Sequence, residues 1–362
     1  MERLTAVYHL RVPAGSADAR ATGIAVEQSV EMPVAAVTDP AILRDIVGQV
    51  ESVTDLGSGV FEARIGLSVA TTGLEAGQLL NMLFGNSSMH PDITLADAEF
   101  PDTVLNAFGG PRHGLAGLRK MAGAEGRAMT CSALKPQGSD ARTLALLAGR
   151  LSKGGLDFVK DDHGIADQHY SPFAERVPRI AEAMAANGKT IYLPSLSGHL
   201  EQMRSQVEIA RAAGVKAVLI APMIAGLATF HALLRDNPDI AFMGHPAMAG
   251  SGQIAPPFLF GKLFRLLGAD AVVFANHGGR FGYSPATCRT LADTALRPWG
   301  TLDAAVPVPA GGMTLARVAE MLQFYGKDVM LLIGGDLLSA GTRISEEAAR
   351  FQDEVVRHSE AL

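Results

Sequence analysis

The sequence has few cysteines, few large aromatic residues and no long basic run. Its two cysteines, Cys131 and Cys288, are too few for a disulfide framework and too isolated for a cysteine-based zinc site. One Trp and five Tyr argue against a surface that binds carbohydrate or single-stranded nucleic acid by stacking. The formal net charge is −6. Since nucleic-acid binding leaves a basic footprint, we expect no nucleic-acid partner.

Membrane-spanning and secretory patterns are also missing. The longest apolar runs, such as residues 217–225, are far shorter than the roughly 20 residues that cross a bilayer. Residues 1–15 are strand-like and lack the apolar centre of a signal peptide. We therefore expect a cytoplasmic protein with no membrane partner. The apolar fraction of 48% and the charged fraction of 19% are typical of a globular chain.

The first 111 residues mix short strands with helices. Alternating apolar residues predict strands, and longer amphipathic stretches predict helices. The expected strands cover 5–12 and 93–100 with a hairpin at 57–70, and the expected helices cover 16–28 and 75–83. This mixture predicts a small α+β domain of ferredoxin-like type over residues 1–111.

Residues 112–362 show a different pattern, in which short apolar runs alternate with helical stretches. Continuous apolar strands separated by helices indicate a parallel sheet covered by helices, and eight of them predict a (β/α)₈ barrel. An open doubly wound sheet is the alternative. The eight runs are 128–134, 156–159, 190–193, 217–221, 240–243, 271–275, 304–308 and 329–333.

Polar and basic residues follow these runs, at the end of a barrel where functional groups lie. Lys135 follows the first run and is a candidate general acid or base. His245 and His277 follow the fifth and sixth runs, where they either contact substrate or serve a structural role. Lys160 to His163 follow the second run. They form either a solvated charged turn or, if the Lys160 amine captures carbon dioxide, a metal site.

Paired glycines follow the seventh and eighth runs, where (β/α)₈ barrels bind phosphate. These are Gly311 with Gly312 and Gly334 with Gly335. Glycine lets backbone N–H groups approach an anion closely. The alternative is that these glycines only end the strands, but two pairs at these two positions favour a phosphate site.

Several segments in a preserved order resemble the large chain of RuBisCO. They are Phe108–Gly114, Leu134–Pro136, Gly154–Asp162, Gly244–Met248, Pro309–Gly312 and Ile333–Gly335. The resemblance implies that Lys160 is carbamylated and binds magnesium together with Asp162, and that Lys135 is catalytic. It also implies a homodimer in which Glu27 and Asn86 of the N-terminal domain reach the barrel mouth of the second subunit.

Departures from the carboxylase pattern indicate a RuBisCO-like protein that does not fix carbon dioxide. The loop 278–282 lacks the mobile lysine of carboxylases, and Arg280 in this loop is a candidate substrate ligand. Pro246 and Ala310 replace residues at the second phosphate site, so one phosphate is expected. His163 stands where the family has a glutamate. Because imidazole is a softer ligand than carboxylate, manganese, iron or zinc compete with magnesium there.

These features together predict metal-dependent enolate chemistry on a small phosphorylated keto acid. The Lys-Asp-Asp-His-Gly variant resembles the apionate branch of the group, which implies a carboxy-lyase that decarboxylates 3-oxo-isoapionate 4-phosphate. The alternatives are a hydrolase or transcarboxylase of that substrate, an enolase or isomerase of a methylthio-ketose phosphate, and a non-catalytic binding protein. Asn86 replaces a lysine typical of the methionine-salvage enolase, which argues against that activity.

Overall fold

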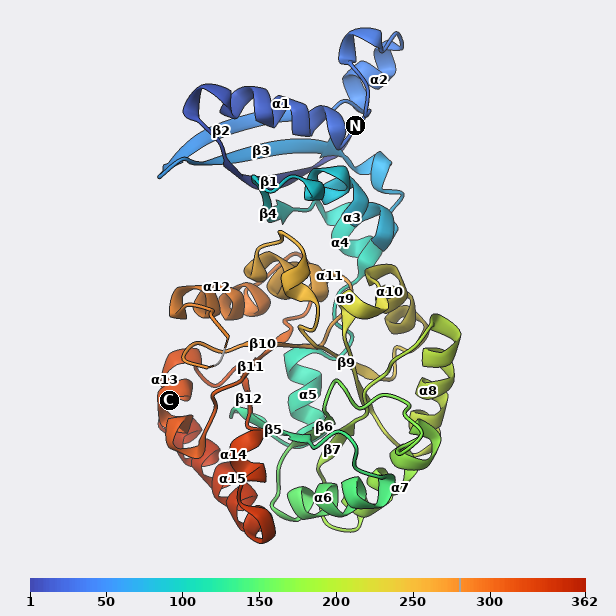
Figure 1. Cartoon of the computed structure of the whole chain (residues 1–362), viewed down its shortest axis with the longest axis vertical. Coiled ribbons are helices and arrows are strands. Elements are labelled where there is room, and N and C mark those ends of the chain that lie inside the picture. The colour runs from blue at the N-terminus through green and yellow to red at the C-terminus, as the bar shows by residue number, and fades with distance from the viewer. Residues whose placement is uncertain (280) are drawn as a thin grey trace. The chain divides into compact units, whose positions relative to one another are not determined.

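The chain forms two units, and the computed structural model describes every residue except 280 (Figure 1). Unit 1 comprises Met1–Gly109, Ala249–Leu259 and Gly300–Leu302. Unit 2 comprises Gly110–Met248, Phe260–Trp299 and Asp303–Leu362. The chain thus returns twice to the N-terminal unit after leaving it, which the sequence pattern does not indicate.

Unit 1 is built on a four-stranded antiparallel sheet with the strand order β2-β3-β1-β4. Alternate side chains of β1 are buried on one face of the sheet, including Leu4, Ala6 and Tyr8, and the Tyr8 hydroxyl donates to the Leu83 carbonyl at 2.5 Å. Helix α1 lies along the sheet (Figure 1). The elements are β1 Arg3–Arg11, α1 Ala17–Glu27, α2 Pro40–Asp45, β2 Gln49–Gly57, β3 Val60–Ser68, α3 Ala76–Phe84, β4 Ile93–Glu99 and α4 Asp102–Phe108.

The hairpin expected within residues 57–70 begins earlier in the chain. Its turn is Ser58–Gly59, where both residues have positive φ, and its first strand is β2. Side chains on both faces of β2 are exposed. Because strand recognition depends on alternation between a buried and an exposed face, β2 was not predicted.

Unit 2 is a closed barrel of eight parallel strands, as predicted. The order is β7-β6-β5-β12-β11-β10-β9-β8, and a parallel bridge between Ser195 and Leu219 joins the two end strands. This closure excludes the open sheet. The strands are β5 Met129–Leu134, β6 Phe158–Asp161, β7 Ile191–Leu193, β8 Ala217–Ile220, β9 Ala241–Gly244, β10 Ala271–Ala275, β11 Val306–Ala310 and β12 Met330–Leu332.

Helices follow the strands and surround them (Figure 1). The segment that precedes β10 is a π-helix, Pro257–Leu263, followed directly by the short helix α11. The helices are α5 Gly114–Ala122, α6 Ala141–Lys153, α7 Phe173–Ala185, α8 Leu200–Ala212, α9 Pro222–Ala225, α10 Leu227–Asp236, α11 Phe264–Leu266, α12 Pro285–Leu296, α13 Val318–Tyr325, α14 Gly335–Leu338 and α15 Ile344–Glu360.

The barrel interior is filled by alternate residues of the strands. Successive side chains of a strand point to opposite faces, so every second residue joins a single buried cluster. Leu118 of α5 and Ala124 belong to the same cluster. The strand residues in it are Met129, Cys131, Phe158, Leu193, Ala217, Leu219, Ala241, Met243, Ala271, Val273, Val306, Val308, Met330 and Leu332.

Helix α5 is anchored at the amino end of the barrel by Asp270, which is 1% exposed. One carboxylate oxygen accepts hydrogen bonds from the backbone N–H groups of His113 and Gly114, and the other accepts from that of Phe242. The three distances lie between 2.7 and 2.8 Å. A single buried side chain therefore joins the start of α5 to the starts of β9 and β10.

Among the described residues, none of the helices combines the length and the apolar character needed to cross a membrane.

We expect Asp270→Ala to lower the free energy of unfolding of the barrel by about 3 kcal/mol or more, because three backbone donors would lose a buried charged acceptor. Urea denaturation followed by circular dichroism measures this. Asp328→Ala is the matched control, because Asp328 pairs with Arg119 of the same helix but is 50% exposed, so its loss should cost less than about 1 kcal/mol. Equal effects of the two substitutions would contradict the anchoring role.

Candidate functional site

The inward-facing series of the barrel strands continues past their carboxyl ends into the polar residues predicted as a site. On β5 the series Met129, Cys131 reaches Lys135, and on β6 it passes from Phe158 through Lys160. The same alternation leads from Met243 of β9 to His245. A period of two residues thus directs side chains from several strands to the carboxyl end of the barrel, where barrel enzymes have their active sites.

Lys160 is the most deeply buried of these residues, with 3% of its surface exposed. Its Nζ donates to the backbone carbonyl of Asp161 at 3.0 Å. Burial lowers the pKa of the Lys160 ammonium group, and the neighbouring Cys131 does not compensate, because burial raises the pKa of its thiol to about 12. A larger fraction of the Lys160 amine is therefore uncharged, which is the nucleophilic form, than in an exposed lysine.

Asp162 connects two other candidate residues. One of its carboxylate oxygens accepts from the Lys135 Nζ, and the other lies 2.8 Å from the Nδ1 of His163. Burial by itself would raise the pKa of Asp162. The hydrogen bonds from His163 and Lys135 and the charge of Lys160 outweigh this effect, so the pKa lies well below its usual range. Asp162 is therefore an ionised carboxylate.

His163 also stacks on His245. The ring centroids are 4.2 Å apart and the planes differ by 12°. The Nδ1 of His245 accepts a hydrogen bond from the backbone N–H of Ala247 at 3.1 Å, which leaves the proton of the neutral ring on Nε2. Burial lowers the pKa of His245. His245 is thus a neutral imidazole with an N–H group available for donation.

His277 has different surroundings. Its ring packs against that of Phe324, with centroids 4.6 Å apart, and its buried Nε2 has no hydrogen-bond partner among the described residues. The preceding residue, Asn276, accepts from the Tyr325 hydroxyl at 2.7 Å. The structure therefore connects Lys135, Asp162, His163 and His245 by contacts, whereas the contacts that His277 makes are with the aromatic residues of α13.

The first glycine pair adopts backbone conformations that other residues rarely reach. Gly311 and Gly312 have φ values of +88° and +67°. A Cβ atom on Gly312 would lie 2.6 Å from the Cα of Gly279, so the loops after β10 and β11 touch backbone to backbone. By contrast, a Cβ on Gly334 would meet no described atom within 4 Å. The pair Gly334–Gly335 thus borders open space at the start of α14.

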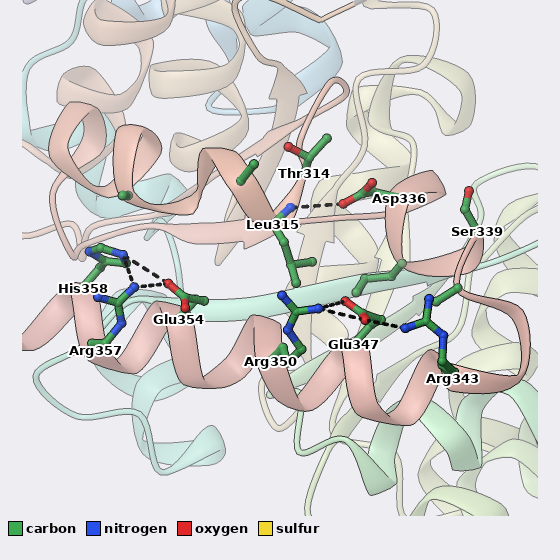
Figure 2. Close-up of a pocket in the computed structure, with 14 residues that line it drawn as sticks. Thr314, Leu315, Asp336, Ser339, Arg343, Glu347, Arg350, Glu354, Arg357 and His358 are labelled. Carbon is green, nitrogen blue, oxygen red and sulfur yellow. Dashed lines mark hydrogen bonds and ion pairs between the residues drawn. The ribbon is translucent and has the colours of Figure 1, made fainter.

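A cavity of about 730 Å³ lies between the segments that follow these glycines and helix α15 (Figure 2). Asp336 accepts from the backbone N–H of Leu315 at 3.1 Å on one side of it. On the other side, Arg350 and Arg343 pair with Glu347 at 3.0 and 3.4 Å. The cavity contains none of the predicted site residues, and its arginines are already paired, so we assign no ligand to it.

The two candidates in unit 1 contact each other. The side-chain amide of Asn86, in the 3₁₀ turn Asn86–Met89, donates to the carboxylate of Glu27 at the end of α1, at 2.8 Å. The remaining candidate, Arg280, lies outside the described residues.

Sequence reasoning missed a buried ion pair directly behind Lys160. Asp161 and Arg176 are both 0% exposed, and an Arg176 nitrogen lies 3.3 Å from an Asp161 oxygen. A signal was present, because Arg176 falls on the apolar face of α7 between Phe173 and Ile180. An arginine at such a position needs a buried partner.

The donor set for a metal is small. In the part of the chain that the structure describes, no three His, Cys, Asp or Glu side chains form a group that could hold a metal ion by themselves. Asp162 and His163 supply two adjacent donors, and a carbamate on Lys160 would supply a third. Hard carboxylate-type oxygens and one imidazole fit magnesium, manganese or another divalent ion.

Comparison with known proteins identifies an isomerase and an enolase among the relatives. The 5-methylthioribulose-1-phosphate isomerase of Rhodospirillum rubrum is 58% identical over 97% of this chain and 95% of its own. The 2,3-diketo-5-methylthiopentyl-1-phosphate enolase of Geobacillus kaustophilus is 31% identical over 72% of this chain and 66% of its own.

The expected carboxy-lyase, acting on 3-oxo-isoapionate 4-phosphate, is therefore wrong, because these relatives are named as an isomerase and an enolase of methylthio compounds. The error has a chemical cause. A buried lysine, a carboxylate and phosphate-binding glycines serve any reaction that passes through an enolate, so they do not distinguish loss of carbon dioxide from movement of a proton.

The fold and the family agree with the sequence motifs. A crystal structure of a Rubisco-like protein from Rhodopseudomonas palustris is 51% identical, covers 98% of both chains and superposes with a TM-score of 0.92. The family model described as ribulose bisphosphate carboxylase large chain, catalytic domain, matches residues 114–348. The chain therefore belongs to the RuBisCO large-chain family, and within it to the RuBisCO-like proteins.

Proposed function

We propose that the protein is an isomerase of a methylthio-ketose phosphate of the 5-methylthioribulose-1-phosphate type. The observation that carries this proposal is the 58% identity, over 97% of the chain, to the Rhodospirillum rubrum isomerase. The missing loop lysine and the replacements Pro246 and Ala310 support a member of the family that does not fix carbon dioxide.

The metal would be held by three groups, which are the carbamate on Lys160, the carboxylate of Asp162 and the imidazole of His163. The buried amine of Lys160 has a lowered pKa, which favours the neutral form that adds to carbon dioxide. The addition forms an N–C bond and releases one proton, and it leaves an anionic oxygen as a ligand. A divalent cation bound there would polarise the substrate carbonyl and make the adjacent C–H bond more acidic. Magnesium is our first assignment, with manganese, iron or zinc as competitors because of His163.

Lys135 and His245 are placed for the proton and oxygen chemistry. An isomerisation takes a proton from a carbon next to the carbonyl and returns one to another carbon, so a single group that is both base and acid is enough. Lys135, whose Nζ contacts the carboxylate of Asp162 at the carboxyl end of the barrel, is our candidate for this role: as the neutral amine it takes the proton, and as the ammonium ion it returns one. The neutral His245 would donate a hydrogen bond from its Nε2–H to a substrate oxygen. His277 is a further candidate for substrate contact.

The glycines would bind the single phosphate, with the substrate extending from there toward Lys135. Gly311, Gly312, Gly334 and Gly335 offer backbone N–H groups without side chains in the way. By resemblance to the family, the functional unit is a homodimer in which the Asn86–Glu27 pair of one subunit reaches the barrel mouth of the other.

Nuclear magnetic resonance in deuterium oxide tests the activity directly. We expect the enzyme, supplied with magnesium and bicarbonate, to convert 5-methylthioribulose 1-phosphate to an isomeric ketose phosphate that retains its phosphate and methylthio groups.

Lys135→Met should lower kcat by about 10²- to 10⁴-fold with little change in KM, since proton transfer matters in the transition state. The exposed Lys153→Met is the control and should behave like wild type.

Unchanged 5-methylthioribulose 1-phosphate would contradict the proposal. Enolisation of 2,3-diketo-5-methylthiopentyl 1-phosphate by the same preparation would instead assign the activity of the enolase relatives.

The phosphate assignment predicts that substitution of Gly334 changes mainly KM, whereas substitution of Gly312 lowers the melting temperature. Gly334→Leu should raise KM at least about tenfold while the melting temperature stays near that of wild type, because the new side chain enters open space that the anion would occupy. Gly312→Ala should lower the melting temperature, because its Cβ would press on Gly279 at a positive φ. If Gly334→Leu leaves KM unchanged, the phosphate does not bind there.

A further inference from the structure

Asp161 lies between the two residues that would bind the metal, yet its side chain points the other way. Lys160 and Asp162 are one residue to either side of it on β6 and the segment that follows. Because side chains of a strand alternate, Asp161 faces outward, toward α7 and β7, while its neighbours face the barrel interior. Any group that fixes the outward direction of Asp161 also fixes the inward direction of Lys160 and Asp162.

The carboxylate of Asp161 is held by three groups, and it is 0% exposed. The Tyr192 hydroxyl of β7 donates to one oxygen at 2.8 Å, and the backbone N–H of Ser195 donates to the other at 3.1 Å. Arg176 of α7 places a guanidinium nitrogen 3.3 Å from that second oxygen.

Arg176 contributes charge more than directional hydrogen bonding. Its Nη1 donates to the Ser171 carbonyl at 2.6 Å, whereas Nε and Nη2 have no hydrogen-bond partner among the described residues. A fully buried guanidinium is costly to desolvate and is retained only beside an opposite charge. Its position therefore fixes where the Asp161 carboxylate must lie.

The backbone of Asp161 links this arrangement to Lys160. The same residue whose side chain is held from outside offers its carbonyl oxygen to the Lys160 Nζ at 3.0 Å. The backbone N–H of Asp162 donates in turn to the Leu134 carbonyl at 3.2 Å. A rotation of the Asp161 peptide unit would thus displace the acceptor of Lys160 and the direction of Asp162 together.

We propose that Arg176 and Tyr192 are positioning residues of the metal site, acting through Asp161 to orient Lys160 and Asp162 toward the barrel interior. This inference rests on the metal site of the proposed function. Groups that orient metal ligands from behind typically change metal affinity by about 10- to 100-fold when they are removed. A purely structural ion pair would change stability and leave metal affinity as it is.

Two matched pairs of variants separate these roles. Tyr192→Phe removes the hydroxyl that holds Asp161, and Thr190→Val removes a hydroxyl of the adjacent segment that donates to the Leu156 carbonyl at 2.6 Å. Arg176→Lys alters the buried ion pair between Arg176 and Asp161. Arg127→Lys alters the pair at the opposite end of the same segment, where Arg127 contacts Asp157 at 2.7 Å.

The experiment titrates the full-length protein with Mn²⁺ in bicarbonate buffer, without substrate, and follows free Mn²⁺ by electron paramagnetic resonance. Tyr192→Phe and Arg176→Lys should raise the Kd for Mn²⁺ by about 10- to 100-fold, and Thr190→Val and Arg127→Lys should leave it within about twofold. Melting temperatures measured alongside should fall for members of both pairs.

The proposal is overturned if all four variants raise the Kd for Mn²⁺ by the same factor, or if none of them changes it. It is also overturned if the wild-type protein binds no Mn²⁺ under these conditions. Because no substrate is present, failure to isomerise a methylthio-ketose phosphate would leave this result standing. Conversely, unchanged affinities in an active isomerase would reject the positioning role alone.

Discussion

The candidate site depends on one geometric constraint, the alternation of side chains along eight short barrel strands. The alternation that buries Met129, Phe158 and Met243 in the interior carries Lys135, Lys160 and His245 to the carboxyl end. No loop has to be shaped separately to bring them together. The amino end is closed by α5 through Asp270, so the interior is filled from one end and chemical groups occupy the other.

The electrostatics of β6 follow from the same alternation. Lys160, Asp161 and Asp162 are consecutive, all at most 7% exposed, and each finds its partners in a different direction. Asp161 is held by Arg176 outside the barrel, Asp162 by Lys135 and His163 inside it. Lys160 has a backbone acceptor. Burial lowers the pKa of this amine, so the neutral form that carbamylation requires is reached more easily than in an exposed lysine.

The sequence was informative about elements that bury apolar side chains, and less so about the rest. All eight barrel strands were located, but β6 was expected at 156–159 and runs over Phe158–Asp161, because strand pairing continues through charged residues. Strand β2 was not predicted, because its side chains are exposed on both faces. The motif around Lys160 indicated the family. It did not indicate the reaction, because the same groups serve any reaction that passes through an enolate. The partners of Asp161 and the stacking of His163 on His245 were not predicted, because they join residues that are distant in the sequence.

We propose that Lys160 becomes a carbamate, and the proposed metal site depends on this step. Carbon-13 resonance of the protein in labelled bicarbonate with magnesium tests it most directly, with Lys160→Arg as the comparison, since arginine keeps a positive charge and forms no such adduct. We expect a carbamate signal in the wild-type protein that is lost in the variant. A wild-type protein without the signal, or a signal of equal strength in Lys160→Arg, would contradict it.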